Sequence, residues 1–244
     1  MPTHSKPRGR RTLHRISNWL AYQWRVTRRS IITIEDVRVR VGRHMSRRVE
    51  QALTKGSCER DELQLIGNLL SPADRVLEIG AGLGLVSTYC AKRIGSDRVF
   101  AYEADPDLEP CIRETYQLNG VDPFLEICAI GARPGRVTLY RDKHFISASV
   151  ARRRAGVHPV EVSGKALNYV VEKAQPTLLV VDGEGAEAEL FDGAELPTVS
   201  RIVLEAHDRV IGPDGTERVL GQLQQIGFRI HLGLSSPEHL ALSR

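Results

Sequence analysis

The chain has 244 residues, of which 41% are hydrophobic and 26% are charged, as in an ordinary globular protein. Its longest apolar runs are only as long as a strand, so we expect no transmembrane helix, and no apolar core of a secretory signal follows the first residues. The four cysteines, Cys58, Cys90, Cys111 and Cys128, lack CxxC spacing, which argues against a zinc site and favours buried thiols in a reducing cytoplasm.

The net charge of +4 is unevenly distributed. Residues 1–48 contain 13 Lys and Arg and two acids, Glu35 and Asp36, a local balance of 13 − 2 = +11. The remaining residues contain 34 − 13 = 21 basic and 30 − 2 = 28 acidic side chains, a balance of −7. A basic segment of this kind suits an anionic partner: a phosphorylated substrate, a membrane surface or a nucleic acid.

The first 70 residues are interpreted as a basic N-terminal extension, disordered over residues 1–10. Apolar side chains recur at helical spacing over 12–27, which predicts a basic amphipathic helix that lies on an anionic membrane, packs on the body of the protein or contacts a second subunit. Two β-branched runs over 31–41 predict a small hairpin. Two helices are expected next, over 46–53 and 59–70, the second ending before Pro72.

Residues 71–244 are expected to form one α/β domain, because strand and helix patterns alternate. Strands are expected over 75–80, 98–104, 124–131, 177–183 and 201–207, and helices over 85–95, 107–120, 165–174, 186–193 and 216–227. Residues 136–142 and 158–164 are expected to be short edge strands. This alternation predicts a doubly wound parallel sheet, and an apparent hairpin over 228–244 makes the last strand antiparallel.

Three glycines, Gly80, Gly82 and Gly84, follow the first strand of this domain in the segment RVLEIGAGLG. A ligand crosses a doubly wound sheet at such a strand-to-helix turn. The dinucleotide fingerprint GxGxxG fails here, because its third glycine would fall on Leu85. The glycines therefore indicate a nucleoside ligand other than a dinucleotide.

Two acids beside the glycines indicate which ligand. The Glu78 carboxylate would repel a pyrophosphate but would pair with the ammonium group of S-adenosylmethionine. Glu103, at the end of the next strand, could accept hydrogen bonds from both ribose hydroxyls. The third strand is expected to run beneath the adenine. The predicted cofactor-binding residues are Glu78, Gly80, Ala81, Gly82, Gly84, Glu103, Ala104, Cys128, Ala129 and Asp182.

A second group of ionisable residues follows two later strands. The segment VVDGEGAE presents Asp182, Glu184 and Glu187, and RIVLEAHD presents Glu205, His207 and Asp208. Active sites collect such groups at strand ends. We predict Asp182, Glu184 and His207 as the catalytic residues.

Two roles are open for that set. His207 or Asp182 could take the proton of an acceptor hydroxyl. Asp182, Glu184 and His207 could instead hold a divalent metal, although the set lacks a compact ligand motif and a metal is not favoured. A solvated surface position for His207 is the alternative to catalysis.

These segments resemble the FkbM-type family of class I methyltransferases, above all DGEGAEAELFDGA followed by VLEAH. The resemblance implies a Rossmann-like sheet of seven strands with the last one antiparallel, S-adenosylmethionine as donor, and O-methylation of a sugar or another hydroxylated natural product. The sequence departs from the family pattern at Val180, Asn168 and Gly82, near the expected acceptor, so the acceptor is left open.

Four functions are compatible with these features. The leading one is an O-methyltransferase whose small-molecule acceptor is hydroxylated and could be anionic or lipid-linked, with a membrane or homo-oligomer contact through the N-terminal helix. An RNA or nucleotide methyltransferase is the alternative, suggested by the basic N-terminus and Arg152–Arg154. Aromatic residues make up only 5% of the chain, which leaves few stacking surfaces for bases. A non-catalytic partner with the same fold and a hydride-transferring enzyme are the remaining alternatives.

Overall fold

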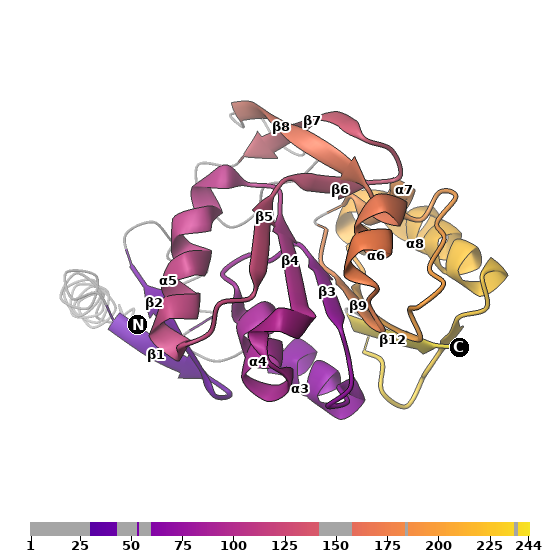
Figure 1. The fold of residues 1–244 in the computed structure, drawn as a ribbon. Helices are drawn as coiled ribbons and strands as arrows, with labels where there is room; N and C mark the ends of the chain where they lie inside the picture. Colours follow the sequence, from indigo (N-terminus) through magenta and orange to yellow (C-terminus); the bar gives the residue numbers. More distant parts are fainter. Residues whose placement is uncertain (1–29, 43–52, 54–59, 142–157, 184, 237–238) are drawn as a thin grey trace, which may run out of the picture.

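The computed structural model describes residues 30–42, 53, 60–141, 158–183, 185–236 and 239–244 (Figure 1). The helix predicted over 12–27, nearly all of the one predicted over 46–53, and Arg152–Arg154 lie outside these residues. Within the described part, no helix is both long enough and apolar enough to cross a membrane.

A seven-stranded sheet forms the centre of the molecule, in the order β11-β12-β10-β9-β3-β4-β5. The last strand, β12, is antiparallel to both of its neighbours, whereas β10, β9, β3, β4 and β5 are parallel. This confirms the predicted sheet and its antiparallel last strand. The strands are β3 (Val76–Ile79), β4 (Val99–Glu103), β5 (Phe124–Ile127), β9 (Leu178–Val181), β10 (Arg201–Glu205), β11 (Arg229–Ile230) and β12 (His239–Ser243).

Helices cover both faces of this sheet (Figure 1). Successive strand residues point to opposite faces: Leu178 and Val180 pack in a core with α3 and α4, while Leu179 and Val181 pack in a second core with α6, α7 and α8. The helices are α3 (Arg60–Leu69), α4 (Leu85–Ile94), α5 (Glu109–Asn119), α6 (Leu167–Ala174), α7 (Glu187–Leu190) and α8 (Asp208–Gln225), with short 3₁₀ turns at Ser96–Arg98 and Pro106–Leu108.

The predicted hairpin is confirmed as β1 (Ser30–Ile34) and β2 (Val37–Val41). Its buried side chains share one core with α3 and α4. It also binds α5, because Arg40 pairs with Glu114 and the Asn119 side chain accepts from the Arg38 N–H (2.9 Å) and donates to the Arg38 carbonyl (2.7 Å). The described part of the extension thus packs into the core of the main domain, and a boundary at residue 70 stays a prediction.

A separate three-stranded sheet corrects one part of the sequence interpretation. Its strands are β6 (Ala129–Gly131), β7 (Gly135–Arg141) and β8 (His158–Ala166), in the order β6-β8-β7. The single strand expected over 124–131 is wrong, because after β5 the chain leaves the central sheet at Cys128 and pairs with β8 instead. Strands β7 and β8 pair with each other, not with the central sheet, and Figure 1 shows them across the carboxyl end of β5.

A polar cluster ties the amino ends of three neighbouring strands together. Asp74, only 2% exposed, precedes β3 and accepts hydrogen bonds from the Arg201 guanidinium and the Thr177 hydroxyl, both at 2.6 Å. Because the three strands are parallel, this cluster lies at the end of the sheet opposite to their carboxyl ends.

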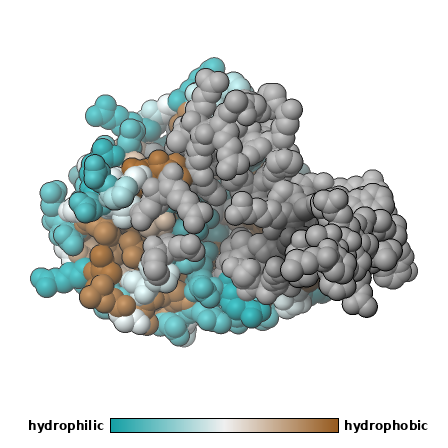
Figure 2. Space-filling view, turned by 180° about the vertical axis from the view of Figure 1, so that it is seen from behind, coloured by the Kyte–Doolittle hydropathy of each residue, from teal (hydrophilic) through white to brown (hydrophobic). Residues whose placement is uncertain are grey.

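The surface seen from behind carries hydrophobic side chains on the side of the C-terminal elements (Figure 2). Two exposed large hydrophobic residues, Leu232 and Leu234, belong to the connection between β11 and β12.

Candidate active site

The turn after β3 is shaped by its glycines. Gly80 has φ +90°, and a Cβ atom there would lie 1.8 Å from the backbone oxygen of Asp182. At Gly84 (φ +73°) a Cβ would meet Ile112 at 2.9 Å, so both positions lack room for a side chain. Gly82 (φ +54°) differs, because nothing lies within 4 Å of a Cβ built there. The middle of the turn therefore faces open space, as a ligand-binding turn requires.

Glu103 ends β4 directly beside this turn. One carboxylate oxygen accepts a hydrogen bond from the Gly82 N–H (2.8 Å), and the other accepts one from the Asp105 N–H (2.7 Å). Burial raises the pKa of the Glu103 carboxyl, and these backbone hydrogen bonds partly oppose that shift. A further backbone hydrogen bond with Ala104 leaves one of the roughly four acceptor sites of the carboxylate, so it is held in place while it can still accept from a ligand hydroxyl.

Other predicted cofactor residues lie near the carboxyl ends of neighbouring strands. Glu78 is 2% exposed and precedes the last residue of β3. Cys128 and Ala129 are buried just after β5. Burial raises the pKa of the Cys128 thiol to about 11, so this side chain is neutral at pH 7 and suits an apolar surface.

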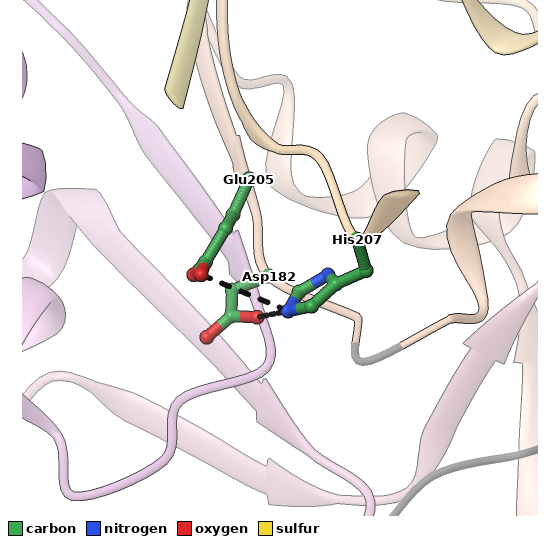
Figure 3. A group of neighbouring side chains, drawn as sticks. All are labelled: Asp182, Glu205 and His207. Atoms are coloured by element: carbon green, nitrogen blue, oxygen red, sulfur yellow. Dashed lines mark ion pairs between the residues drawn. The ribbon is translucent and has the colours of Figure 1, made fainter. Parts of the chain in front are cut away.

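Asp182, Glu205 and His207 come together at the carboxyl ends of β9 and β10 (Figure 3). The His207 Nε2 atom lies 3.5 Å from an Asp182 oxygen and 3.7 Å from a Glu205 oxygen. One ligand-type atom from each residue lies within 4.8 Å of the others, and all three residues are partly buried. We call these three residues the acid–histidine group.

Glu187 contacts this group through the His207 ring. It is 1% exposed, at the start of α7, and its two oxygens accept from the N–H groups of Gly183 and Gly185, each at 2.8 Å. The oxygen that binds Gly183 also lies 2.9 Å from Nδ1 of His207. An ionised carboxylate only accepts, so Nδ1 carries the hydrogen in this contact, and Nε2 is the atom presented to the two other carboxylates.

The glycine turn and the acid–histidine group are adjacent. β3 pairs with β9, and the Asp182 N–H donates to the Ile79 carbonyl at 2.9 Å, just before Gly80. Strand β10 follows β9 in the sheet and brings Glu205 and His207 to the same edge. Two loops about a hundred residues apart in sequence thus meet at one end of the sheet.

A family model, the methyltransferase FkbM domain, matches residues 78–230, which is more than half of the chain and includes both loops. The chain belongs to the FkbM methyltransferase domain family. It is therefore a methyltransferase that uses S-adenosylmethionine, as the resemblance of the sequence implied. A search of curated protein sequences found no match.

Solved structures of methyltransferases are similar to this FkbM-domain chain. The tRNA (uracil-54, C5)-methyltransferase of Pyrococcus abyssi, in complex with S-adenosyl-L-homocysteine, superposes with a TM-score of 0.51 at 16% identity. The alignment covers 88% of this chain but only 43% of that protein. A ribosomal protein L11 methylase from Lactobacillus delbrueckii subsp. bulgaricus has a TM-score of 0.48 at 14% identity, covering 78% and 79%. At these identities the likeness concerns the fold alone.

The residues at the glycine turn fit the donor of the FkbM family. Open space lies over Gly82, a fixed buried carboxylate stands at Glu103, and a second buried acid stands at Glu78. These two carboxylates match a ligand with ribose hydroxyls and an ammonium group, and neither offers a positive charge to a pyrophosphate. The contacts of all the predicted cofactor-binding residues with the donor stay predictions.

The structure brings Asp182 and His207 of the predicted catalytic set together and adds Glu205 to them. Glu184 lies outside the described residues, so its place in the set stays a prediction. The sequence interpretation did not assign a role to Glu187. The two glycines before its helix, Gly183 and Gly185, were the available signal, because they expose the N–H groups that its carboxylate binds.

Proposed function

We propose that this FkbM-domain methyltransferase methylates a hydroxyl group of a saccharide or another hydroxylated small molecule. The observation that carries the proposal is the contact between Gly80 and Asp182, which sets the acid–histidine group beside the donor turn. A hydroxyl must lose its proton as it is methylated, so a proton acceptor is needed within reach of the methyl group.

The chemistry of the chain's residues follows from their placement. S-adenosylmethionine, when bound, supplies a methyl group on a positively charged sulfur. The acceptor hydroxyl loses its proton to the acid–histidine group, and its oxygen forms a bond to the methyl carbon while the carbon–sulfur bond breaks and the electron pair stays on sulfur. Most of the acceleration comes from holding the two reacting atoms about 3 Å apart in line.

The basic segment over residues 1–48 supports an anionic or lipid-linked acceptor within this proposal. Its charge balance of +11 would attract a phosphorylated or carboxylated molecule to a body of net charge −7. Its predicted amphipathic helix would lie on an anionic membrane that carries such an acceptor. The proposal thus includes a charged acceptor met at a membrane surface.

The first experiment is a calorimetric titration of the wild-type protein with S-adenosylmethionine and, separately, with NAD. We expect binding of the methyl donor only, and at least ten-fold weaker donor binding in Glu103→Ala. Glu109→Ala, which removes another glutamate, on α5, is the matched control and should bind like the wild type.

The second experiment uses methyl-labelled donor with a panel of neutral and anionic saccharides and with unmodified RNA. Label that stays in a saccharide after treatment with base, as expected of a methyl ether, supports O-methylation of a hydroxylated small molecule. Label in RNA alone would contradict the proposal and favour the nucleic-acid alternative. No transfer to any acceptor together with no donor binding would favour a non-catalytic partner.

A further inference from the structure

We infer that Asp182, Glu205 and His207 bind a divalent cation. The binding of the cation follows from the site itself, whereas its part in the reaction rests on the proposed function. The site shares Asp182 and His207 with the metal set considered from the sequence and adds Glu205.

The first argument is the composition and spacing of the donor atoms. One imidazole nitrogen and two carboxylate oxygens lie within 4.8 Å of one another (Figure 3). Ligands of one ion at 2.0–2.2 Å from it are roughly 3 to 4.5 Å apart, so small movements of side chains bring these atoms onto a common centre. The residues come from the ends of two adjacent strands, which fixes their backbone positions.

The second argument is independent of the donor atoms and concerns the orientation of the ring. Glu187, which is outside the donor set and almost fully buried, accepts from Nδ1 of His207. A histidine that binds a metal through one nitrogen usually donates its other N–H to a carboxylate or carbonyl, which fixes the tautomer. Here that partner leaves Nε2 directed toward Asp182 and Glu205.

The third argument is electrostatic. With Nδ1–H bound to Glu187, a neutral ring would aim the lone pair of Nε2 at two carboxylate oxygens, at 3.5 and 3.7 Å. The lone pair carries partial negative charge, so it and the two carboxylates repel one another unless a positive charge lies between them. A divalent cation or a proton on Nε2 would supply that charge, and these two possibilities can be separated by experiment.

A cation at this site has a chemical use. Carboxylate-rich sites with one histidine suit Mg²⁺ and Mn²⁺, which take six ligands, so three positions remain for water or for an acceptor oxygen. A cation would lower the pKa of a hydroxyl that it binds, so the hydroxyl would lose its proton to solvent more readily before its oxygen attacks the methyl carbon. With the cation bound, this route replaces direct proton transfer to the acid–histidine group. The site would also orient an acceptor that has two adjacent hydroxyls.

The test is Mn²⁺ binding measured by electron paramagnetic resonance, in which the signal of free Mn²⁺ falls as the ion binds. We expect about one site per wild-type chain, at least ten-fold weaker binding in Glu205→Gln and in Asp182→Asn, and displacement of Mn²⁺ by Mg²⁺. Glu189→Gln, which removes an exposed acid of the same loop and helix, is the matched control and should bind Mn²⁺ like the wild type.

Donor binding is measured on the same samples. Folded wild-type protein that binds S-adenosylmethionine but leaves the Mn²⁺ signal unchanged would overturn the cation site and show that a proton on Nε2 closes the group. Equal Mn²⁺ binding by wild type and Glu205→Gln would also overturn it. Loss of methyl transfer with Mn²⁺ binding intact would instead count against the proposed function alone.

Discussion

Gly80 and Asp182 touch through their backbones: a Cβ atom on Gly80 would come within 1.8 Å of the Asp182 carbonyl oxygen. The contact joins the donor turn after β3 to the acidic loop after β9. It depends on the absence of a side chain at Gly80, and it sets the distance between the two halves of the site.

The first prediction compares two glycines of this turn. Gly80→Ala should lower the free energy of unfolding by about 2–4 kcal/mol, because the new methyl group meets backbone that cannot move aside. Gly82→Ala should cost only about 1–2 kcal/mol, since its positive φ is strained but the space is open. Urea unfolding checks both values. Equal losses in the two variants would show that the Asp182 contact does not limit residue 80.

The same pair separates folding from ligand binding. Gly82→Ala should weaken S-adenosylmethionine binding by more than its small loss of stability suggests, because its methyl group enters the space over the turn. Calorimetric titration of the folded variant measures this. Unchanged affinity would place the donor elsewhere.

A second prediction concerns pH and Glu103. Burial raises the pKa of Glu103 in the folded protein above its usual value of 4.5, so within the window between the two values the folded state binds more protons than the unfolded state. The contribution of Glu103 to stability therefore falls as the pH rises through that window. Relative to Glu103→Ala, the wild type should become more stable as the pH is lowered from 7 toward 4.5. Urea titrations at several pH values check the slope, and a difference that shrinks on acidification would contradict it.

A third prediction concerns Glu187. Glu187→Ala removes the partner of two backbone N–H groups and of His207, and should lower the free energy of unfolding by about 2–4 kcal/mol. Glu189→Ala on the same helix removes an exposed side chain and should change it by less than about 0.5 kcal/mol. Thermal and urea unfolding give both values. Similar small effects would mean that Glu187 does not hold the acidic loop.

A fourth prediction tests whether the N-terminal hairpin belongs to the core. Ile34→Ala should cost about 2–5 kcal/mol, because this side chain is fully buried in the core shared with α3 and α4. Ile31→Ala, on the same strand but 39% exposed, should cost far less. A single cooperative transition that shifts in Ile34→Ala shows one folding unit, whereas a separate early transition would support a boundary at residue 70.

Much of the fold was predictable because its signals are local. The apolar runs of β3 and β9 and the glycine turn after β3 have the lengths and residue types of buried parallel strands and a ligand turn. The split at Cys128 was not predictable, since alternation along 124–131 gives a strand but does not tell which strand pairs with it. The partner of β6 is β8, more than thirty residues later in the chain.

The candidate site was predictable at the level of strand ends and less so for individual side chains. Parallel strands bring their carboxyl ends together, so Asp182 and His207 were expected to meet, and they do. The choice of Glu205 as the third member depends on distances in space that sequence spacing does not give. The role of Glu187 depends on a backbone path through Gly183 and Gly185 that only the structure shows.

The polar cluster around Asp74 separates two kinds of constraint along the same strands. It ties β3, β9 and β10 at their amino ends, through Thr177 and Arg201, about one strand length from the acid–histidine group. Selection for a new acceptor therefore acts on the carboxyl ends of the strands, while the cluster at their amino ends keeps the strands in register. An engineer who wishes to change specificity has the same freedom: libraries at the carboxyl ends can be large, provided that Asp74, Thr177 and Arg201 are left as they are.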